Sequence, residues 1–292
     1  MYELIRAGAK SWYINCPAKI GIYQADEENV YLIDSGNDKD AGRKVRKILD
    51  EKDWVLRGIL NTHSNADHIG GNRYLQQNTG CKVFTDGIEA AFTEHPILET
   101  SFLYGGYPCA DLRHKFLMAA ESEVSGFSDP DFPKEVEVIP LPGHFFDMVG
   151  FHIPDGTVFL ADCLSSRSTL EKYQVSFIYD VDAYLKTLDR VKAMQADLFV
   201  PAHAEAGRDL SGLIDFNRQK VLEVADKLVS FCERPMIFED VLQKVFQEYG
   251  LEMNFEQYVL VGSTVRSYLS WLKDTGKLGV SFADGRLLWK RV

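Results

Sequence analysis

Apolar and polar residues follow one another along the first third of the chain in a pattern that predicts short strands and amphipathic helices in turn. Four apolar runs have the length and the flanking turn residues of strands, at residues 18–23, 30–33, 56–60 and 81–84. Helical spacing of apolar residues between these runs predicts helices over 38–53 and through Tyr74 and Leu75 to about Gly80. This order predicts an α/β fold, in which the loops after the strands commonly carry a site.

The strand pattern returns in the second half of the chain, after a stretch of a different kind. Strands are predicted at residues 136–139, 150–153, 158–161 and 198–201, with a helix over 182–195. Residues 85–133 show no clear strand pattern and are rich in aromatic residues. We interpret them as a partly helical insertion, which either covers a site or adds a packed helical layer.

The chain from residue 208 onward is predicted to be mainly helical. Apolar stripes at helical spacing lie within 238–249 and 265–272, and the sequence ends in a hairpin pattern. Two helices followed by a hairpin predict a small winged-helix-like module at about 233–292. We therefore expect a catalytic domain over 1–207 and a helical C-terminal region over 208–292.

Composition narrows the choice of partners and location. The net charge of −11 over 292 residues repels phosphate backbones, so nucleic acid is a disfavoured partner. The five cysteines form no C-x-x-C pair, which fits a reducing compartment better than a disulfide framework. No stretch has the roughly 18 apolar residues of a membrane span, and the N-terminal residues do not resemble a signal peptide. We expect a cytoplasmic protein that is not inserted in a membrane.

The candidate chemistry begins with the segment HSNADH, which follows the predicted strand 56–60. His63, Asp67 and His68 are three metal-ligand residue types within six positions, and Asn65 is a weaker fourth. Because the segment forms a loop, several of these side chains can converge. Imidazole and carboxylate together suit zinc, iron or manganese.

Three more ligand-type residues occur where an apolar run stops. His144 stands in LPGHFF, Asp162 in FLADCL and His203 in FVPAHAE, each at the end of a predicted strand. One such residue would be unremarkable, since a lone histidine is more often structural. Four strand ends with the same feature favour convergence on one site.

These motifs resemble those of the metallo-β-lactamase superfamily, in particular its glyoxalase II-like hydrolases. The family pattern is HxHxDH, then a PGH element, an aspartate after a strand and a late histidine, and this chain has the elements in that order between about residues 17 and 205. The resemblance implies a four-layer αββα sandwich with a metal site at one edge of its sheets, here followed by the small winged-helix-like C-terminal domain.

Carried over to this chain, the resemblance implies one or two divalent metal ions. Zinc is the first expectation, with iron or manganese as alternatives. His63 and His144 would bind the first ion, Asp67, His68 and His203 the second, and Asp162 would bridge the two. Asp67 is also the expected catalytic carboxylate. A hydroxide held by the metal would attack the substrate, because coordination lowers the pKa of water toward neutrality.

This chain departs from the family pattern at Asn65, which replaces the second histidine. An amide oxygen is a weaker zinc ligand than an imidazole nitrogen. The second ion should therefore bind more tightly than the first. The substitution also leaves open a mononuclear or catalytically impaired site.

The remaining candidates concern the substrate. Tyr104 and His114 in the insertion are candidate substrate-binding residues, whereas His95 and His152 have the more ordinary surroundings of structural histidines. The family often has histidine or serine where Asp147 stands, so this loop differs from the common pattern.

The leading functional hypothesis is a metal-dependent hydrolase of a small ester, thioester or lactone. A nuclease of the same superfamily ranks lower, because residues 233–292 hold eight Lys/Arg against eight Asp/Glu and show no basic excess. A mononuclear iron dioxygenase acting on sulfur compounds, and a catalytically impaired metal-binding protein, are further alternatives. The expected partner is a small molecule, and the C-terminal module allows a homodimer.

Overall fold

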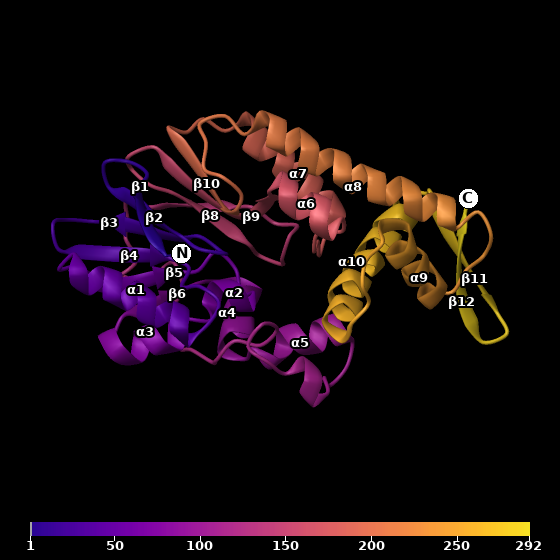
Figure 1. The fold of residues 1–292 in the computed structure, drawn as a ribbon, viewed down its shortest axis with the longest axis horizontal. Coiled ribbons are helices and arrows are strands. Elements are labelled where there is room, and N and C mark those ends of the chain that lie inside the picture. Colours follow the sequence, from indigo (N-terminus) through magenta and orange to yellow (C-terminus); the bar gives the residue numbers. More distant parts are fainter. Residues whose placement is uncertain (1) are drawn as a thin grey trace.

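The computed structural model describes residues 2–292 and arranges most of them as two facing β-sheets with helices on both outer sides (Figure 1). The first sheet has six strands in chain order, β1 (Glu3–Arg6), β2 (Ser11–Asn15), β3 (Ile20–Gln24), β4 (Asn29–Ile33), β5 (Val55–Leu60) and β6 (Lys82–Phe84). Strands β1 to β4 pair antiparallel, whereas β4, β5 and β6 are parallel, so the loops after β4 and β5 leave the same edge of the sheet.

The second sheet has four strands in the order β10 (Leu198–His203), β9 (Thr157–Ser165), β8 (Val149–His152) and β7 (Glu137–Pro140). Strands β9 and β10 run parallel, and the other two pairs are antiparallel. Three helices stand beside this sheet, α6 (Arg167–Tyr173), α7 (Val181–Ala193) and α8 (Ser211–Phe231).

Three apolar cores hold these layers together. One lies between the two sheets and contains Tyr23, Phe84, Phe151 and Phe159. A second joins the six-stranded sheet to helices α1 (Lys39–Glu51) and α3 (Asn72–Thr79), through residues such as Ile22, Val45 and Leu75. A third joins the four-stranded sheet to α7 and α8 and includes Leu160, Leu188 and Leu228. The expected four-layer αββα sandwich is confirmed.

The expected insertion is partly helical. After the short α2 (Ala66–Ile69) and the strand β6, it contains α4 (Gly87–Glu94), α5 (Ile97–Tyr104) and the 3-10 turn η1 (Ala110–Leu112). Its residues Leu103, Leu112 and Leu117 form a small apolar cluster with Val259, which belongs to the C-terminal region. The insertion thus packs against the end of the chain.

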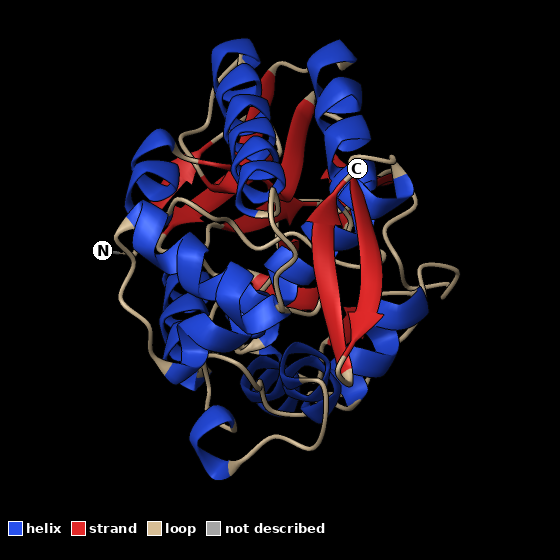
Figure 2. Cartoon of the chain, turned by 90° about the vertical axis from the view of Figure 1, so that its right-hand side faces the viewer, coloured by secondary structure: helices blue, strands red, loops and turns tan. Residues whose placement is uncertain are grey.

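The C-terminal region contains α9 (Phe238–Tyr249), α10 (Phe255–Asp274) and a hairpin of β11 (Leu278–Ala283) and β12 (Arg286–Arg291). The hairpin faces the viewer in Figure 2. The largest apolar cluster continues from the four-stranded sheet into α9 and α10 without a break at residue 207. The winged-helix-like character of this region and the domain division at 207/208 stay predictions. Over residues 2–292, no helix has both the length and the apolar character needed to cross a membrane.

Two local features fix the loops that leave the sheets. The first is Gly143, between β7 and β8, whose φ of 122° is a conformation that suits glycine. Its carbonyl oxygen accepts hydrogen bonds from the backbone N–H groups of Tyr179 and Asp180, both at 3.0 Å. A Cβ atom at this position would overlap the backbone of Tyr184 at the start of α7. The loop before His144 therefore packs directly on α7.

The second feature is the buried carboxylate of Glu89 in α4, whose side chain is 1% exposed. It accepts hydrogen bonds from the backbone N–H groups of Ser64 and Asp147, both at 2.9 Å. Burial raises the pKa of Glu89 to about 7, although these hydrogen bonds act to lower it. The insertion is thus tied to the two loops that carry HSNADH and the PGH element.

We predict that Gly143→Ala destabilises the fold much more than Gly80→Ala. Gly80 also has a positive φ, of 72°, but a Cβ there would meet no atom within 4 Å. The control should cost about 1–2 kcal/mol from its left-handed backbone alone. The overlap at Gly143 should add about 1–3 kcal/mol. Urea unfolding checks this, and equal losses in the two variants would contradict the close packing on α7.

We also predict that Glu89→Gln changes the pH dependence of stability. Between pH 4.5 and about 7 the folded state keeps a proton on Glu89 that the unfolded state has lost, so the wild type loses stability as pH rises. The stability of the variant relative to the wild type should therefore increase by on the order of 3 kcal/mol across this range. Urea unfolding with chelator present at pH 4.5 and 7.5 measures it. A difference that stays constant with pH would show that Glu89 does not titrate in this range.

Candidate metal centre

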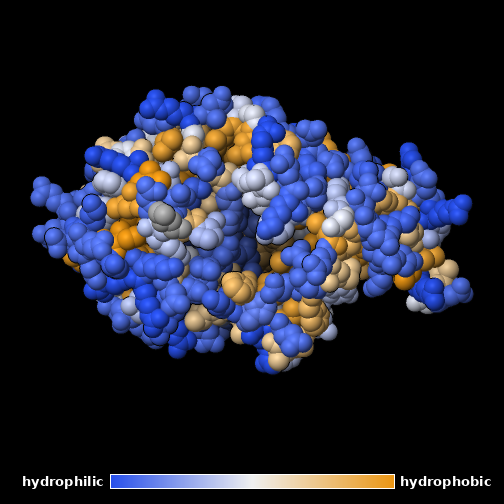
Figure 3. Space-filling view, viewed as in Figure 1, coloured by the Kyte–Doolittle hydropathy of each residue, from blue (hydrophilic) through white to orange (hydrophobic). Residues whose placement is uncertain are grey.

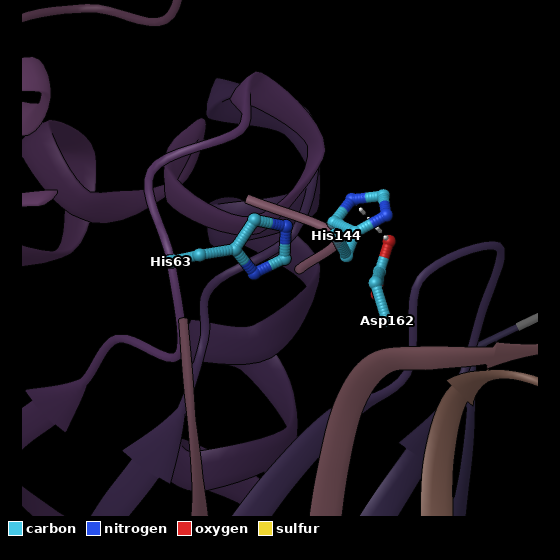
Figure 4. Close-up of side chains that lie close together, drawn as sticks. All are labelled: His63, His144 and Asp162. Carbon is cyan, nitrogen blue, oxygen red and sulfur yellow. Dashed lines mark ion pairs between the residues drawn. The ribbon is translucent and has the colours of Figure 1, made fainter. Parts of the chain in front are cut away.

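The six histidines and aspartates expected to bind metal meet at one edge of the sandwich, although they come from five different parts of the chain. His63 follows β5, Asp67 and His68 lie in α2, His144 is in the loop between β7 and β8, Asp162 is within β9, and His203 ends β10. They form two groups, within each of which one potential ligand atom per residue lies within 4.8 Å of the others. We call His63, His144 and Asp162 the first triad (Figure 4) and Asp67, His68 and His203 the second triad.

Asp162 links the two triads. One of its carboxylate oxygens lies 3.1 Å from His68 Nε2, and the other lies 3.1 Å from His203 Nε2 and 3.5 Å from His144 Nε2. Asp67 also approaches His203 Nε2, to 3.3 Å. The arrangement places Asp162 where a ligand shared by two ions would have to be.

Several of these atoms are buried without a hydrogen-bond partner. Within residues 2–292 this holds for His63 Nε2, and for His68 Nε2 and Asp162 Oδ1, which lie 3.1 Å apart but outside hydrogen-bond geometry. An unsatisfied buried polar atom costs about 1–3 kcal/mol, so three of them in one place need a reason. Divalent cations at the two triads would satisfy these atoms, and nitrogen and carboxylate donors suit zinc. The residues present therefore fit a bound metal.

The opposite ring nitrogens of the histidines are held by other groups. His144 Nδ1 donates to the carbonyl oxygen of Phe177 and His203 Nδ1 to that of Pro17, both at 3.0 Å. His68 Nδ1 lies 2.7 Å from Asp34 Oδ2. These contacts fix the rings with Nε2 toward the centre, as is usual for metal-binding histidines.

Asp34 was not among the residues predicted from the sequence. It directly follows β4 and also accepts hydrogen bonds from the backbone N–H and the hydroxyl of Thr62, at 2.8 and 2.7 Å. Its φ of 63° is unusual for a residue other than glycine. A sequence signal did exist, because Asp34 ends an apolar strand in the same way as His144 and His203.

The carboxylates dominate the electrostatics of the centre. Burial lowers the pKa of His203, but Asp162 and Asp67 outweigh it and raise the value to about 10. Asp162 and Asp67 likewise raise the pKa of His68 well above its ordinary value. Burial instead lowers the pKa of His63 and His144. The same field that holds protons on two histidines attracts a cation.

Backbone strain accompanies the site at Asp162. The preceding residue, Ala161, has a φ of 50°, and the pairing of β9 with β10 changes register at Pro201. Such irregularities redirect a side chain out of the regular alternation of a strand. Asp162 was predicted to stand at the end of a strand, but it lies within β9. The irregularity turns its side chain toward the histidines.

Asn65 lies beside the first triad, between a histidine and a carboxylate. Its Oδ1 is 3.2 Å from His144 Nε2, and its Nδ2 donates to Glu99 Oε1 at 2.6 Å. Glu99 belongs to α5 and is 5% exposed. Sequence reasoning missed Glu99, because a single acidic residue on an insertion helix carries no motif.

The two candidate substrate residues lie elsewhere. His114 Nε2 pairs with Glu256 Oε1 at 3.0 Å, and the ring of Tyr104 packs edge-on against Phe255, 6.1 Å between centroids. Within the described chain, neither side chain forms a hydrogen bond or ion pair with a residue of the triads. Their substrate-binding role stays a prediction. His152 pairs with Glu137 on the surface, at 3.2 Å, as expected of a structural histidine.

A hollow opens on the molecular face shown in Figure 3, between the sandwich and the C-terminal helices, and its deepest part is hydrophilic. Phe177 stands next to the first triad, its ring centroid 5.5 Å from that of His144, and it is only partly buried. Asp67 and His203 are the most open members of the centre, with 43% and 27% of their side chains exposed. A small molecule can therefore approach from the side of the second triad.

Known proteins with similar sequences include several hydrolases. A Drosophila melanogaster protein named Beta-lactamase-like protein 2 homolog is 23% identical over 87% of this chain and 84% of its own length. Hydroxyacylglutathione hydrolase from Methylococcus capsulatus is 26% identical over 52% of this chain, and a linear primary-alkylsulfatase from a Pseudomonas strain is 22% identical over 75%. These two matches span 50% and 48% of the relatives' own lengths.

Solved structures share the fold over nearly the whole chain. A beta-lactamase domain protein from Burkholderia ambifaria has a TM-score of 0.75 at 16% identity, covering 99% of this chain and 94% of its own. A metallo-beta-lactamase family protein from Thermus thermophilus has a TM-score of 0.72 at 16% identity, covering 97% and 99%. The family model described as "Metallo-beta-lactamase superfamily" matches residues 15–203, which include all six residues of the two triads, and the chain belongs to this superfamily.

Proposed function

We propose that this chain is a metal-dependent hydrolase acting on a small ester, thioester or lactone. The observation that carries the proposal is the pair of adjacent triads linked by Asp162, in which His63 Nε2, His68 Nε2 and Asp162 Oδ1 are buried and form no hydrogen bond. The six side chains would hold two divalent cations, zinc first among the candidates. Bound there, the cations would polarise a substrate carbonyl and lower the pKa of water toward neutrality.

The chain's own residues supply orientation and charge around this centre. Asp67 is 43% exposed, and burial acts to raise its pKa, but His68 and His203 lower it by more, so the carboxylate stays ionised at neutral pH. An ionised and accessible carboxylate can accept a hydrogen bond from water and so orient it toward a substrate. Asp67 is therefore the proposed catalytic carboxylate.

The surroundings favour a substrate with an acyl group and an apolar part. Phe177 offers an apolar wall beside His144, and Phe102, Phe145 and Phe146 pack behind it. Among the relatives, those named hydroxyacylglutathione hydrolase act, by name, on an acyl derivative of glutathione. This supports hydrolysis of an acyl compound over the other reactions considered.

One geometric feature favours a second candidate. Each triad by itself contains two histidines and one carboxylate, which is the ligand set of mononuclear iron oxygenases. Such an enzyme would carry one iron per chain and consume oxygen, whereas the proposed hydrolase carries zinc or another divalent cation and needs no oxygen.

We predict that protein purified without added metal contains a divalent metal and hydrolyses at least one member of a panel of esters, thioesters and lactones. Chelator should abolish the activity, and zinc should restore it. Asp162→Asn should lower kcat/KM by at least about a hundredfold, since it weakens a ligand shared by both ions. His152→Asn, which changes a surface histidine outside the centre, is the matched control. Full activity in the presence of chelator would refute the hydrolase, and one iron per chain with oxygen uptake would favour the dioxygenase.

We further predict that the two ions leave the protein at different chelator concentrations. The first triad has Asn65 where an imidazole would bind more strongly, so its ion should be lost first. Chelator titration with metal analysis should show two steps, with about one metal per chain remaining between them. A single step at which both metals leave together would contradict the difference in affinity.

A further inference from the structure

The side-chain amide of Asn65 has a defined orientation at the edge of the first triad. Its oxygen lies on the side of His144 Nε2, at 3.2 Å, while its nitrogen points away and donates to Glu99 at 2.6 Å. The orientation decides what the residue can do, because only the amide oxygen can bind a cation. The amide nitrogen carries two hydrogens and would repel one.

Glu99 provides a physical reason for this orientation. Glu99 Oε1 accepts a hydrogen bond from Asn65 Nδ2 at 2.6 Å, which engages the amide nitrogen and leaves the amide oxygen facing His144. Turning the amide over would break this bond and place the amide N–H groups toward His144 Nε2. Glu99 is buried, so breaking the bond would leave its carboxyl group without a partner, which costs free energy.

The insertion holds Glu99 in place. Phe102 packs edge-on against Phe146, with centroids 5.2 Å apart, and Leu103 joins the apolar cluster with Val259 of α10. Glu99 is thereby 5% exposed and cannot turn out to solvent without moving α5.

We propose that Glu99 is a positioning residue, which turns the carbonyl oxygen of Asn65 toward the first triad so that this oxygen completes the ligand set of His63, His144 and Asp162. The inference rests on the metal centre of the proposed function. Through Glu99, the insertion would orient a metal ligand as well as pack beside the site. This role of Glu99 also explains how an asparagine can stand where the family pattern HxHxDH has its second histidine.

The test is a double-mutant cycle on metal binding, measured by titrating metal-free protein with Co²⁺ against a competing chelator. Absorption of bound Co²⁺ reports binding at each site without any need for activity. Glu99→Gln should lower the affinity of the first site by about 10- to 100-fold, the usual effect of losing a group that orients a ligand. The affinity of the second site should change by no more than about twofold.

Asn65→Ala should cause a similar loss at the first site. Adding Glu99→Gln to Asn65→Ala should then cause no further loss, since Glu99 acts only through Asn65. Thr100→Val is the matched control, because it perturbs the same buried stretch of α5 without touching Asn65. It should lower thermal stability and leave both metal affinities unchanged. Should Glu99→Gln not fold, Glu99→Asp, which keeps the charge but shortens the reach, should give the same selective loss.

Five results would overturn the role of Glu99. Full additivity in the double variant would mean that Glu99 binds the metal itself. An equal loss at both sites, or the same loss in Thr100→Val, would mean that α5 acts only through packing, and an unchanged first site would exclude any role. Wild-type protein that takes up no metal would overturn this inference together with the metal centre, whereas metal binding without hydrolysis would overturn only the hydrolase.

Discussion

The site depends on the carboxylate of Asp162 being surrounded by imidazoles from three other parts of the chain. His68 and His203 each approach it to 3.1 Å, and His144 follows at 3.5 Å. Ionised groups buried this deeply are costly unless they are paired or hold a metal. The carboxylate therefore requires the histidines, and the buried Nε2 atoms of His63 and His68, which form no hydrogen bond, are suited to bind a cation. Charge balance in one small volume thus links both sheets and α2.

Irregular backbone within or directly after the strands places these side chains. Ala161 and Asp34 both have positive φ values, and each stands at or next to a residue that the centre uses. Such strain persists only where the surrounding packing enforces it. Here the core between the two sheets does so, since Phe151 and Phe159 fix β8 and β9 against β3 and β6. The packing of the core between the sheets therefore maintains the strained backbone that positions the residues of the site.

Much of this could be predicted from the sequence, because the ligands of the centre occur within or soon after apolar strands and stand in recognisable order. Strands β3 to β10 and helices α1, α3 and α7 appear near their predicted positions. Strands β1 and β2 escaped prediction, because β1 has only two apolar residues between Glu3 and Arg6, and β2 has only three between Ser11 and Asn15. Asp34 was missed although it ends a strand, and Glu99 could not have been found, since its partner Asn65 lies 34 positions away on another element. Long-range pairs of this kind depend on tertiary packing, which periodicity does not encode.

The insertion and the C-terminal helices add contacts that support the loop HSNADH from outside the sandwich. Leu103, Leu112 and Leu117 pack on Val259, so α5 is supported from outside the sandwich by α10. The same helix α5 brings Glu99 to Asn65, and the buried Glu89 of α4 holds the backbone of Ser64 one residue earlier. The loop HSNADH is therefore braced from its outer side by acidic residues of the insertion. A metal-binding loop with an amide in place of an imidazole needs such a brace, because an amide can turn either its oxygen or its nitrogen toward the ion, whereas a histidine ring held at Nδ1 presents a nitrogen donor.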